Sequence, residues 1–406
     1  MNYNVISGSV TSPKGFKANG IHCGVKEGTT KKDLALVYSE VPCTCAGMYT
    51  NNKVKCAPIF ITKEHLKNNI AQAVIINSGN ANCCTGQDGL DKAKEETKLV
   101  GKELNINPDD VLVASTGVIG VPLNLEAIKS GIPELVKGLC SDGSLAASAI
   151  MTTDTVKKEV ACTVDIGGQK VTIGAIAKGS GMIEPNMGTM LSFISTDASI
   201  SADMLDAALR EAVNVSYNRI SVDGDTSTND TVIIFANGMA ENEIISSKND
   251  DYYAFVEALK YVTVTIAKKL AKDGEGATKL IECTVNGCKN EKDGVIFAKS
   301  VITSSLVKTA MFGADANWGR VLCALGYAGV DFEPEKIDVE FTSKSGSILV
   351  CKNGSQVEFS EDLAKKILLE DEITIKISMG LGNDSVTCYG CDLTYDYVKI
   401  NGDYRS

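Results

Sequence analysis

The amino-acid sequence predicts a globular protein of mixed α/β or α+β class. Short apolar runs typical of buried strands alternate with longer stretches that have helical periodicity. Apolar residues make up 44% of the chain and charged residues 22%, which is an ordinary globular composition, and the 37 glycines indicate many turns. A chain of 406 residues exceeds the usual size of one domain, so we expect one large or two medium domains.

Charge and hydropathy exclude several classes of protein. The net charge of −11 disfavours a nucleic-acid partner and an anionic membrane surface. The first residues show neither a basic segment nor an apolar segment of a secretory signal, and no apolar run reaches the length of a membrane span. We therefore expect a cytoplasmic protein with no nucleic-acid or membrane partner.

Fourteen cysteines raise the question of a metal site. Cys388 and Cys391 form a CxxC pair and Cys43 and Cys45 a CxC pair, but zinc normally requires a second pair or histidines, and the chain has only two histidines. The acidic loop 223–230 lacks the twelfth-position glutamate and the flanking helices of a calcium-binding EF-hand. The sequence therefore predicts reduced structural thiols, no metal and no cofactor.

Apolar patterns place the regular elements along the chain. Strands are expected at 33–38, 73–76, 110–115, 160–166, 170–176, 190–194 and 231–235, and helices at 90–104, 145–151 and 253–272. Ser201 is expected to cap a further helix that runs through Met204 and Val213. Gly167-Gly168 between two of these strands is a hairpin signal, and Asn353-Gly354 is another. The runs 373–377 and 385–388 are interpreted as one antiparallel pair, and the C-terminal segment 397–406 is expected to dock because it contains apolar residues.

The most unusual segment is Lys178-Gly-Ser-Gly-Met-Ile-Glu-Pro-Asn-Met-Gly-Thr-Met-Leu191, which directly follows the hairpin. Its glycines permit unusual backbone conformations, and Pro185 fixes one backbone angle. Thr189 follows Gly188, which has no side chain, so its hydroxyl is a candidate nucleophile. A site that follows a rigid strand is held more precisely than one within a long loop.

Four other segments could complete such a site. Asn77-Ser-Gly-Asn-Ala-Asn82 follows a strand, as either a strand-to-helix turn or a loop whose backbone approaches a ligand or another segment. Thr116-Gly117 also follows a strand, where a hydroxyl and a backbone N–H could together stabilise an oxyanion. Thr152-Thr153 ends a predicted helix. Glu275 lies between two glycines past a helix end, where an acid opposes the helix dipole but could hold an ammonium group.

In this order and spacing, these segments resemble the ArgJ family, the ornithine acetyltransferases, over essentially the whole chain. Asp273-Gly-Glu-Gly-Ala-Thr-Lys279, Asn317-Trp-Gly-Arg320 and the end from Asn401 to Ser406 extend the resemblance. It implies a layered α/β sandwich of sheets flanked by helices, ArgJ/DmpA-like, of the self-cleaving N-terminal-nucleophile type. Cleavage between Gly188 and Thr189 would give an alpha chain, 1–188, and a beta chain, 189–406, that assemble as a heterotetramer.

The resemblance also assigns roles to individual residues. It implies that Thr189 is the nucleophile and that Thr116 and Gly117 form the oxyanion hole. The substrate contacts that it implies are Thr152, Lys178, Thr189, Glu275, Asn401 and Ser406, with Thr153 as an alternative to Thr152. Gly188 departs from the alanine that is commoner in the family, and we expect cleavage to persist with it.

The chemistry of such a site is consistent with the residues. A threonine hydroxyl needs a base, and neither His22 nor His65 has a motif that would supply one. An N-terminal α-amine has an ordinary pKa near 8, so cleavage before Thr189 would create the base. The implied function, in arginine biosynthesis, is ping-pong transfer of acetyl from N-acetylornithine to glutamate, with acetyl-CoA left open as a second donor.

Three alternatives remain open on the sequence. In the nearest one, an N-terminal-nucleophile amidase or aminopeptidase passes the acyl group to water. A Ser-Lys hydrolase could instead use Ser180 and Lys178, although their spacing in a loop need not bring them together. A non-catalytic anion-binding protein could use the glycine-rich turns, but no phosphate-binding motif supports it.

Overall fold

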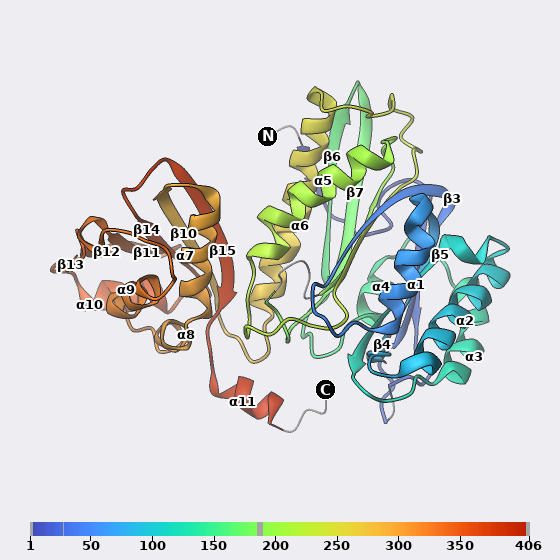
Figure 1. Ribbon diagram of the computed structural model, residues 1–406, viewed down its shortest axis with the longest axis horizontal. Helices are drawn as coiled ribbons and strands as arrows, with labels where there is room; N and C mark the ends of the chain where they lie inside the picture. The colour runs from blue at the N-terminus through green and yellow to red at the C-terminus, as the bar shows by residue number, and fades with distance from the viewer. Residues whose placement is uncertain (1–2, 27, 185–189, 403–406) are drawn as a thin grey trace.

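The computed structural model describes residues 3–26, 28–184 and 190–402 and shows two lobes, each built on one sheet (Figure 1). The first lobe contains a nine-stranded sheet and the second a six-stranded sheet. Helix α6 lies on the side of the first lobe that faces the second (Figure 1). This arrangement confirms the predicted mixed α/β class, with sheets flanked by helices.

The nine-stranded sheet has the order β1-β6-β7-β8-β9-β3-β4-β5, with β2 paired to β3. Within this order β8–β9 and β4–β5 are parallel pairs and the remaining pairs are antiparallel. The strands are β1 (Tyr3–Ile6), β2 (Phe16–Ile21), β3 (Leu34–Tyr49), β4 (Ile70–Asn80), β5 (Val111–Val118), β6 (Lys158–Ile166), β7 (Gln169–Lys178), β8 (Leu191–Thr196) and β9 (Thr231–Ala236).

Helices cover both faces of this sheet. They are α1 (Ala57–His65), α2 (Gly86–Leu104), α3 (Leu125–Lys137), α4 (Ser144–Ala149), α5 (Ala202–Val215) and α6 (Asp250–Lys272). Along β4, Val74 and Ile76 pack in the cluster that contains α4, whereas Ala73 and Ile75 pack against α2 and α3. Because both faces are buried, the central strands are continuous apolar runs rather than alternating patterns.

The six-stranded sheet has the order β13-β12-β11-β14-β10-β15. Its elements are β10 (Leu280–Cys288), β11 (Asp338–Ser343), β12 (Gly346–Lys352), β13 (Ser355–Gln356), β14 (Glu372–Ser378), β15 (Asp384–Cys391), α7 (Glu291–Thr303), α8 (Ser305–Phe312), α9 (Trp318–Gly326) and α10 (Glu361–Leu368). In β14, Ile373, Ile375 and Ile377 are buried, whereas the residues between them are partly exposed. One face therefore packs on helices and the other is only partly covered.

Short 3₁₀ turns join several of these elements. They are at Leu66–Asn68, Pro108–Asp110, Tyr217–Arg219 and Pro334–Lys336. Among the described residues, no single helix is both long and apolar enough to span a membrane, and only the bent pair α7 and α8, with 58° between its helices, meets that length and composition together. The fourteen cysteines are free thiols, and most of them are buried.

The predicted strands and helices are present close to their expected positions, but the pairing of 373–377 with 385–388 is wrong. Strand β10 lies between β14 and β15, parallel to the first and antiparallel to the second. Both runs have the alternation of a sheet strand, which identifies the strand and its buried face but not its neighbour. The pairing is decided by packing between distant parts of the chain.

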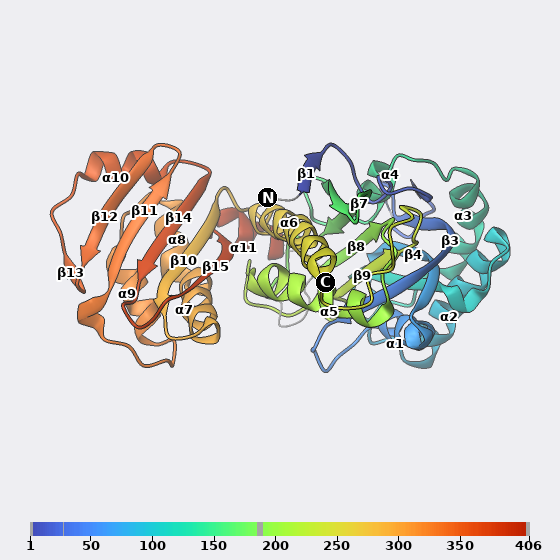
Figure 2. The same cartoon turned by 90° about the horizontal axis from the view of Figure 1, so that it is seen from above.

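The C-terminal segment docks through polar groups. Helix α11 (Tyr395–Asn401) begins after Thr394, whose hydroxyl donates to the carbonyl of Gly276 at 2.6 Å. Val398 is 70% exposed, so the expectation that apolar side chains hold the segment from residue 397 is wrong for this residue, whereas Tyr397 and Ile400 are partly buried. Figure 2 shows α11 lying between the two lobes.

Candidate active site

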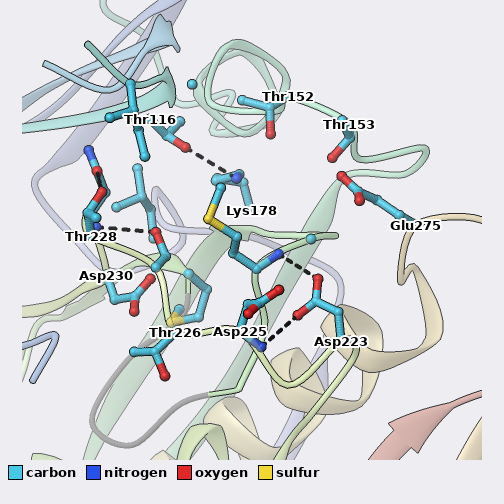
Figure 3. A pocket seen from close by; sticks show the side chains of 18 of the residues that line it. Thr116, Thr152, Thr153, Lys178, Asp223, Asp225, Thr226, Thr228, Asp230 and Glu275 are labelled. Carbon is cyan, nitrogen blue, oxygen red and sulfur yellow. Dashed lines mark hydrogen bonds between the residues drawn. The ribbon is translucent and has the colours of Figure 1, made fainter. Parts of the chain in front are cut away.

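One cavity of about 390 Å³ gathers segments from both ends of the chain (Figure 3). Its walls come from the ends of β5 and β7, the segment after α4, the loop 223–230, the segment after α6, and α11. The lining residues that the sequence analysis named are Thr116, Gly117, Thr152, Thr153, Lys178, Glu275 and Asn401. These segments are far apart in the sequence, so the tertiary fold assembles the cavity.

The end of β5 presents Thr116 and Gly117 to the cavity. Gly117 has φ +134°, and a Cβ there would lie 2.3 Å from the carbonyl carbon of Gly79. Strand β4 has a register shift at this point, so the two backbones approach closely. A glycine is therefore required at 117. The segment 77–82, whose first four residues extend β4, approaches another chain segment, as one interpretation of the sequence expected.

Buried amides hold these two strand ends in place. Asn77 accepts a hydrogen bond from the Ser115 hydroxyl at 2.6 Å and donates to the carbonyl of Asn80 at 2.9 Å. Asn229, from the loop before β9, donates to the carbonyls of Ala81 and Ser115, each at 2.7 Å. Because every contact satisfies a buried polar group, a rearrangement here would leave groups unpaired.

Lys178 is the last residue of β7 and is 7% exposed. Its ammonium donates to the Thr116 hydroxyl at 3.3 Å (Figure 3). Burial lowers the pKa of Lys178, while the carboxylates of Asp154, Asp230 and Glu275 act in the opposite direction. The lysine therefore places its side-chain nitrogen directly beside the candidate oxyanion hole.

A second buried lysine, Lys158, joins the segment that contains Asp154 to the segment that contains Asp273. Its ammonium donates to Asp154 at 2.7 Å and to Asp273 at 2.5 Å. Asp154 also accepts from the backbone amides of Thr152 at 3.0 Å and Gly179 at 2.7 Å. Burial raises the pKa of Asp154, but Lys158, Lys178 and the Gly179 amide together lower it to about 2. Asp154 is therefore an anion that holds two walls of the cavity.

Glu275 forms the opposite wall, just before β10. Its backbone amide donates to the carbonyl of Ser180 at 2.9 Å, and its carboxylate accepts from Asn401 at 2.8 Å. A Cβ at Gly181 would lie 2.4 Å from the Glu275 carboxylate, so the segment after β7 passes directly beside the acid. Gly276, with φ +70°, packs against α11 in the same way.

Three of the predicted site residues, Gly188, Thr189 and Ser406, lie outside the described residues. The described neighbour of Thr189 is Met190, which is 3% exposed and lines the cavity. Strand β8 starts at Leu191, which pairs with Lys178. The segment containing the predicted cleavage point therefore leaves the sheet at Lys178 and rejoins it beside the same residue.

Comparisons with known proteins now identify the family. A model of the ArgJ family matches residues 17–406. The chain belongs to the ArgJ family. It is 52% identical to the arginine biosynthesis bifunctional protein ArgJ 1 of Clostridium acetobutylicum over 98% of both chains. It is 51% identical to the arginine biosynthesis bifunctional protein ArgJ of Caldanaerobacter subterraneus, over 99% of this chain and all of the relative.

A solved structure of an ArgJ-family protein also matches. The crystal structure of the arginine biosynthesis bifunctional protein argJ of Bacillus halodurans is 46% identical, with a TM-score of 0.51. The match covers 100% of that crystal chain but 53% of this one. The solved chain is therefore about half as long as the chain described here.

The loop 223–230 is the largest part of the cavity wall of this ArgJ-family chain that sequence patterns did not predict, and Asn52 and Ile119 also line the cavity without having been predicted. It supplies Asp223, Asp225, Thr226, Ser227, Thr228, Asn229 and Asp230 to the lining. The carboxylate of Asp223 accepts from the amides of Met182 and Ile183, each at 2.7 Å, and burial raises its pKa. A run of polar residues directly before a buried strand is the available signal in the sequence, although this run does not match a calcium-binding loop.

The structure disfavours Ser180 and Lys178 as a catalytic pair. The Ser180 hydroxyl donates to the carbonyl of Asp273 at 2.6 Å, whereas Lys178 donates to Thr116. Ser180 is 1% exposed and holds the segment of Glu275 in place. Its hydroxyl therefore has a structural role.

Among the described residues, no group of three His, Cys, Asp or Glu side chains could hold a metal ion.

Proposed function

We propose that this chain is an arginine-biosynthesis acyltransferase that moves acetyl from N-acetylornithine to glutamate through an acetyl ester on Thr189. The observation that carries the proposal is that one cavity brings together Thr116, Gly117, Lys178 and Glu275 with Met190, the residue next to Thr189. Relatives of about 50% identity over nearly the whole chain are named arginine biosynthesis proteins, which supports the same activity.

The base in this proposal is the α-amine that cleavage before Thr189 creates. His65 is buried, and its Nδ1 lies 2.8 Å from the carbonyl oxygen of Val111. The Nδ1 of His22 lies 3.1 Å from Oδ2 of Asp33. Neither imidazole is among the described residues that line the cavity. An amine with an ordinary pKa near 8 can accept the threonine proton at neutral pH, whereas Lys178 already donates to Thr116.

Self-cleavage would divide the chain into 1–188 and 189–406, two copies of each assembling as a cytoplasmic heterotetramer. The crystal chain of the Bacillus halodurans relative supports the division, because its whole length corresponds to 53% of this chain. The division also preserves the sheet. Residues on both sides of the cut remain in strands, since Lys178 of β7 stays paired with Leu191 of β8.

The transfer has two halves. The Thr189 hydroxyl attacks the acetyl carbonyl of N-acetylornithine, its proton goes to the α-amine, and Thr116 with the Gly117 amide stabilises the oxyanion. The C–N bond then breaks, the amine proton goes to the leaving nitrogen, and ornithine departs. The amine of glutamate attacks the ester in the same way, which releases N-acetylglutamate. Lys178 would hold a substrate carboxylate and Glu275 an ammonium group, because each has the opposite charge.

A gel and an assay test the proposal. The purified chain is expected to give two fragments instead of one 43.0 kDa band, with the second fragment beginning at Thr189. It should form N-acetylglutamate from glutamate and N-acetylornithine, and acetyl-CoA is tested as a second donor because the relatives are named bifunctional. Thr189→Ala should abolish both cleavage and transfer, a loss of about 10³-fold or more.

Other outcomes point to the alternative functions. A chain that transfers acetyl at full rate without cleavage would contradict the mechanism. Release of acetate in the absence of glutamate would instead identify a hydrolase.

A further inference from the structure

The proposed mechanism lacks a base for its first step. The α-amine of Thr189 exists only after the chain has been cut, so it cannot deprotonate the Thr189 hydroxyl during self-cleavage. The same step also needs an acid, because the departing nitrogen must receive a proton. A group that accepts a proton and then returns it would meet both needs.

Asp230 is a buried carboxylate that the acetyl transfer described above does not use. It lines the cavity and is 2% exposed, and among the described residues its Oδ2 has no hydrogen-bond partner. Figure 3 shows it beside Thr226 and Thr228, away from Glu275. An unpaired buried carboxylate oxygen is costly, so a functional reason is expected for it.

The position of Asp230 follows from the sheet. Strands β8 and β9 are parallel, and Leu191 pairs with Thr231. The amide of Thr231 donates to the carbonyl of Met190 at 3.0 Å, so Asp230, the residue before Thr231, lies close to Met190. Asp230 therefore lines the same cavity as Met190, the residue that follows Thr189 in the sequence.

We propose that Asp230 is the proton carrier of self-cleavage, a role that rests on the proposed function and precedes it. The Asp230 carboxylate takes the proton of the Thr189 hydroxyl as Oγ bonds to the carbonyl carbon of Gly188. The tetrahedral adduct collapses, the C–N bond breaks, and Asp230 returns the proton to the Thr189 nitrogen. Water then hydrolyses the resulting ester, which frees the Gly188 carboxylate and the Thr189 hydroxyl. Asp230 ends the step unchanged.

The surroundings of Asp230 suit a reversible proton carrier. Burial raises the pKa of Asp230 well above its ordinary value. The charge of Lys178, the hydroxyls of Ser227 and Thr50, and the Met190 amide act to lower this pKa. Cys56, at the start of α1, is the titratable group on another side. A carboxyl group with a raised pKa can donate a proton at neutral pH as well as accept one.

The test follows processing of the full chain made by cell-free synthesis, with a matched control. Asp230→Asn should slow the conversion of the 43.0 kDa chain into fragments by about 10²-fold or more. The control is Asp197→Asn, another buried acid in this lobe, whose two oxygens already accept from the amides of Thr172 and Lys14. It should process within about twofold of the wild-type rate.

The pH dependence separates proton transfer from a structural role. Because Asp230 must be ionised to accept the proton, wild-type processing should accelerate as pH rises through its raised pKa. Asp230→Glu should process faster than Asp230→Asn, and the small fraction of Asp230→Asn that becomes cut should transfer acetyl within about tenfold of wild type. Thermal unfolding checks that both variants fold. If Asp230→Asn does not fold, the wild-type pH profile and the processing rate of Asp230→Glu test whether Asp230 carries the proton.

Different experimental results would contradict the role of Asp230 and the proposed function on which it rests. If the wild-type chain remains one band and transfers no acetyl, the proposed function is wrong. If the wild-type chain cleaves but Asp230→Asn cleaves equally fast, or if wild-type processing does not change between about pH 5 and pH 9, Asp230 is not the proton carrier.

Discussion

The two lobes bury different kinds of side chain. The interior of the six-stranded lobe is apolar, with Phe297 and Phe341 packed between its sheet and helices. Where that lobe buries Lys279, backbone carbonyls of Met311 and Leu368 satisfy the ammonium. The nine-stranded lobe instead buries charged groups beside the cavity, such as Lys158 with Asp154 and Asp273. Their ion pairs join segments that are distant in the sequence. We infer that the nine-stranded lobe has charged groups in place of apolar packing beside the cavity because these groups position the site. The six-stranded lobe mainly stabilises the fold.

The largest expected effect comes from a methyl group where two backbones meet. In Gly117→Ala the new Cβ would lie 2.3 Å from the Gly79 carbonyl carbon, so the candidate oxyanion hole must move. Loss of one oxyanion donor typically costs about 10²–10³-fold in rate, and we expect acetyl transfer to fall by that factor. Steady-state kinetics of the purified variant would measure it. The control in the other lobe is Gly326→Ala, where the new Cβ meets nothing within 4 Å, and its rate should not change.

The next effect comes from the buried charge network. Lys158→Met would leave Asp154 and Asp273 buried without their cation, and removing one partner of a buried pair costs about 3–5 kcal/mol of unfolding free energy. Because Asp154 also holds the amides of Thr152 and Gly179, we expect KM for N-acetylornithine to rise as well. Denaturant unfolding and kinetics on the same sample test both effects.

A core variant of the second lobe provides the comparison. Phe341→Ala should lower the unfolding free energy by a similar amount, about 3–5 kcal/mol, because Phe341 is fully buried. Its KM should not change below the unfolding transition, since Phe341 is not among the described residues that line the cavity. Equal KM values for the two variants would remove the proposed difference between the lobes.

The smallest effect is expected where the C-terminal helix meets the cavity. Asn401→Ala removes one hydrogen bond to Glu275 from an exposed side chain. A single bond of this kind contributes about 1 kcal/mol, so kcat/KM should fall by about fivefold with no change in thermal stability. The control is Lys399→Ala on the same helix. An equal loss in both variants would indicate that α11 acts only through its helical structure.

Local patterns in the sequence determined much of the fold and part of the candidate site. The hairpin at Gly167-Gly168 and the strands before Thr116 and after Met190 follow from turn chemistry and apolar runs, which depend on neighbouring residues. The order of the motifs identified the ArgJ family and named seven described residues that line the cavity.

Only the tertiary structure decided the rest. Lys158 meets Asp273 across 115 positions of sequence, and Asn229 meets Ser115 across 114. No local pattern encodes these contacts, or the insertion of β10 between β14 and β15. The sequence shows Asp230 only as one acid in a polar loop, whereas the parallel pairing of β8 and β9, with Leu191 beside Thr231, brings Asp230 close to Met190. A sequence specifies which residues are buried and where the backbone turns, but packing chooses the partners of buried polar groups.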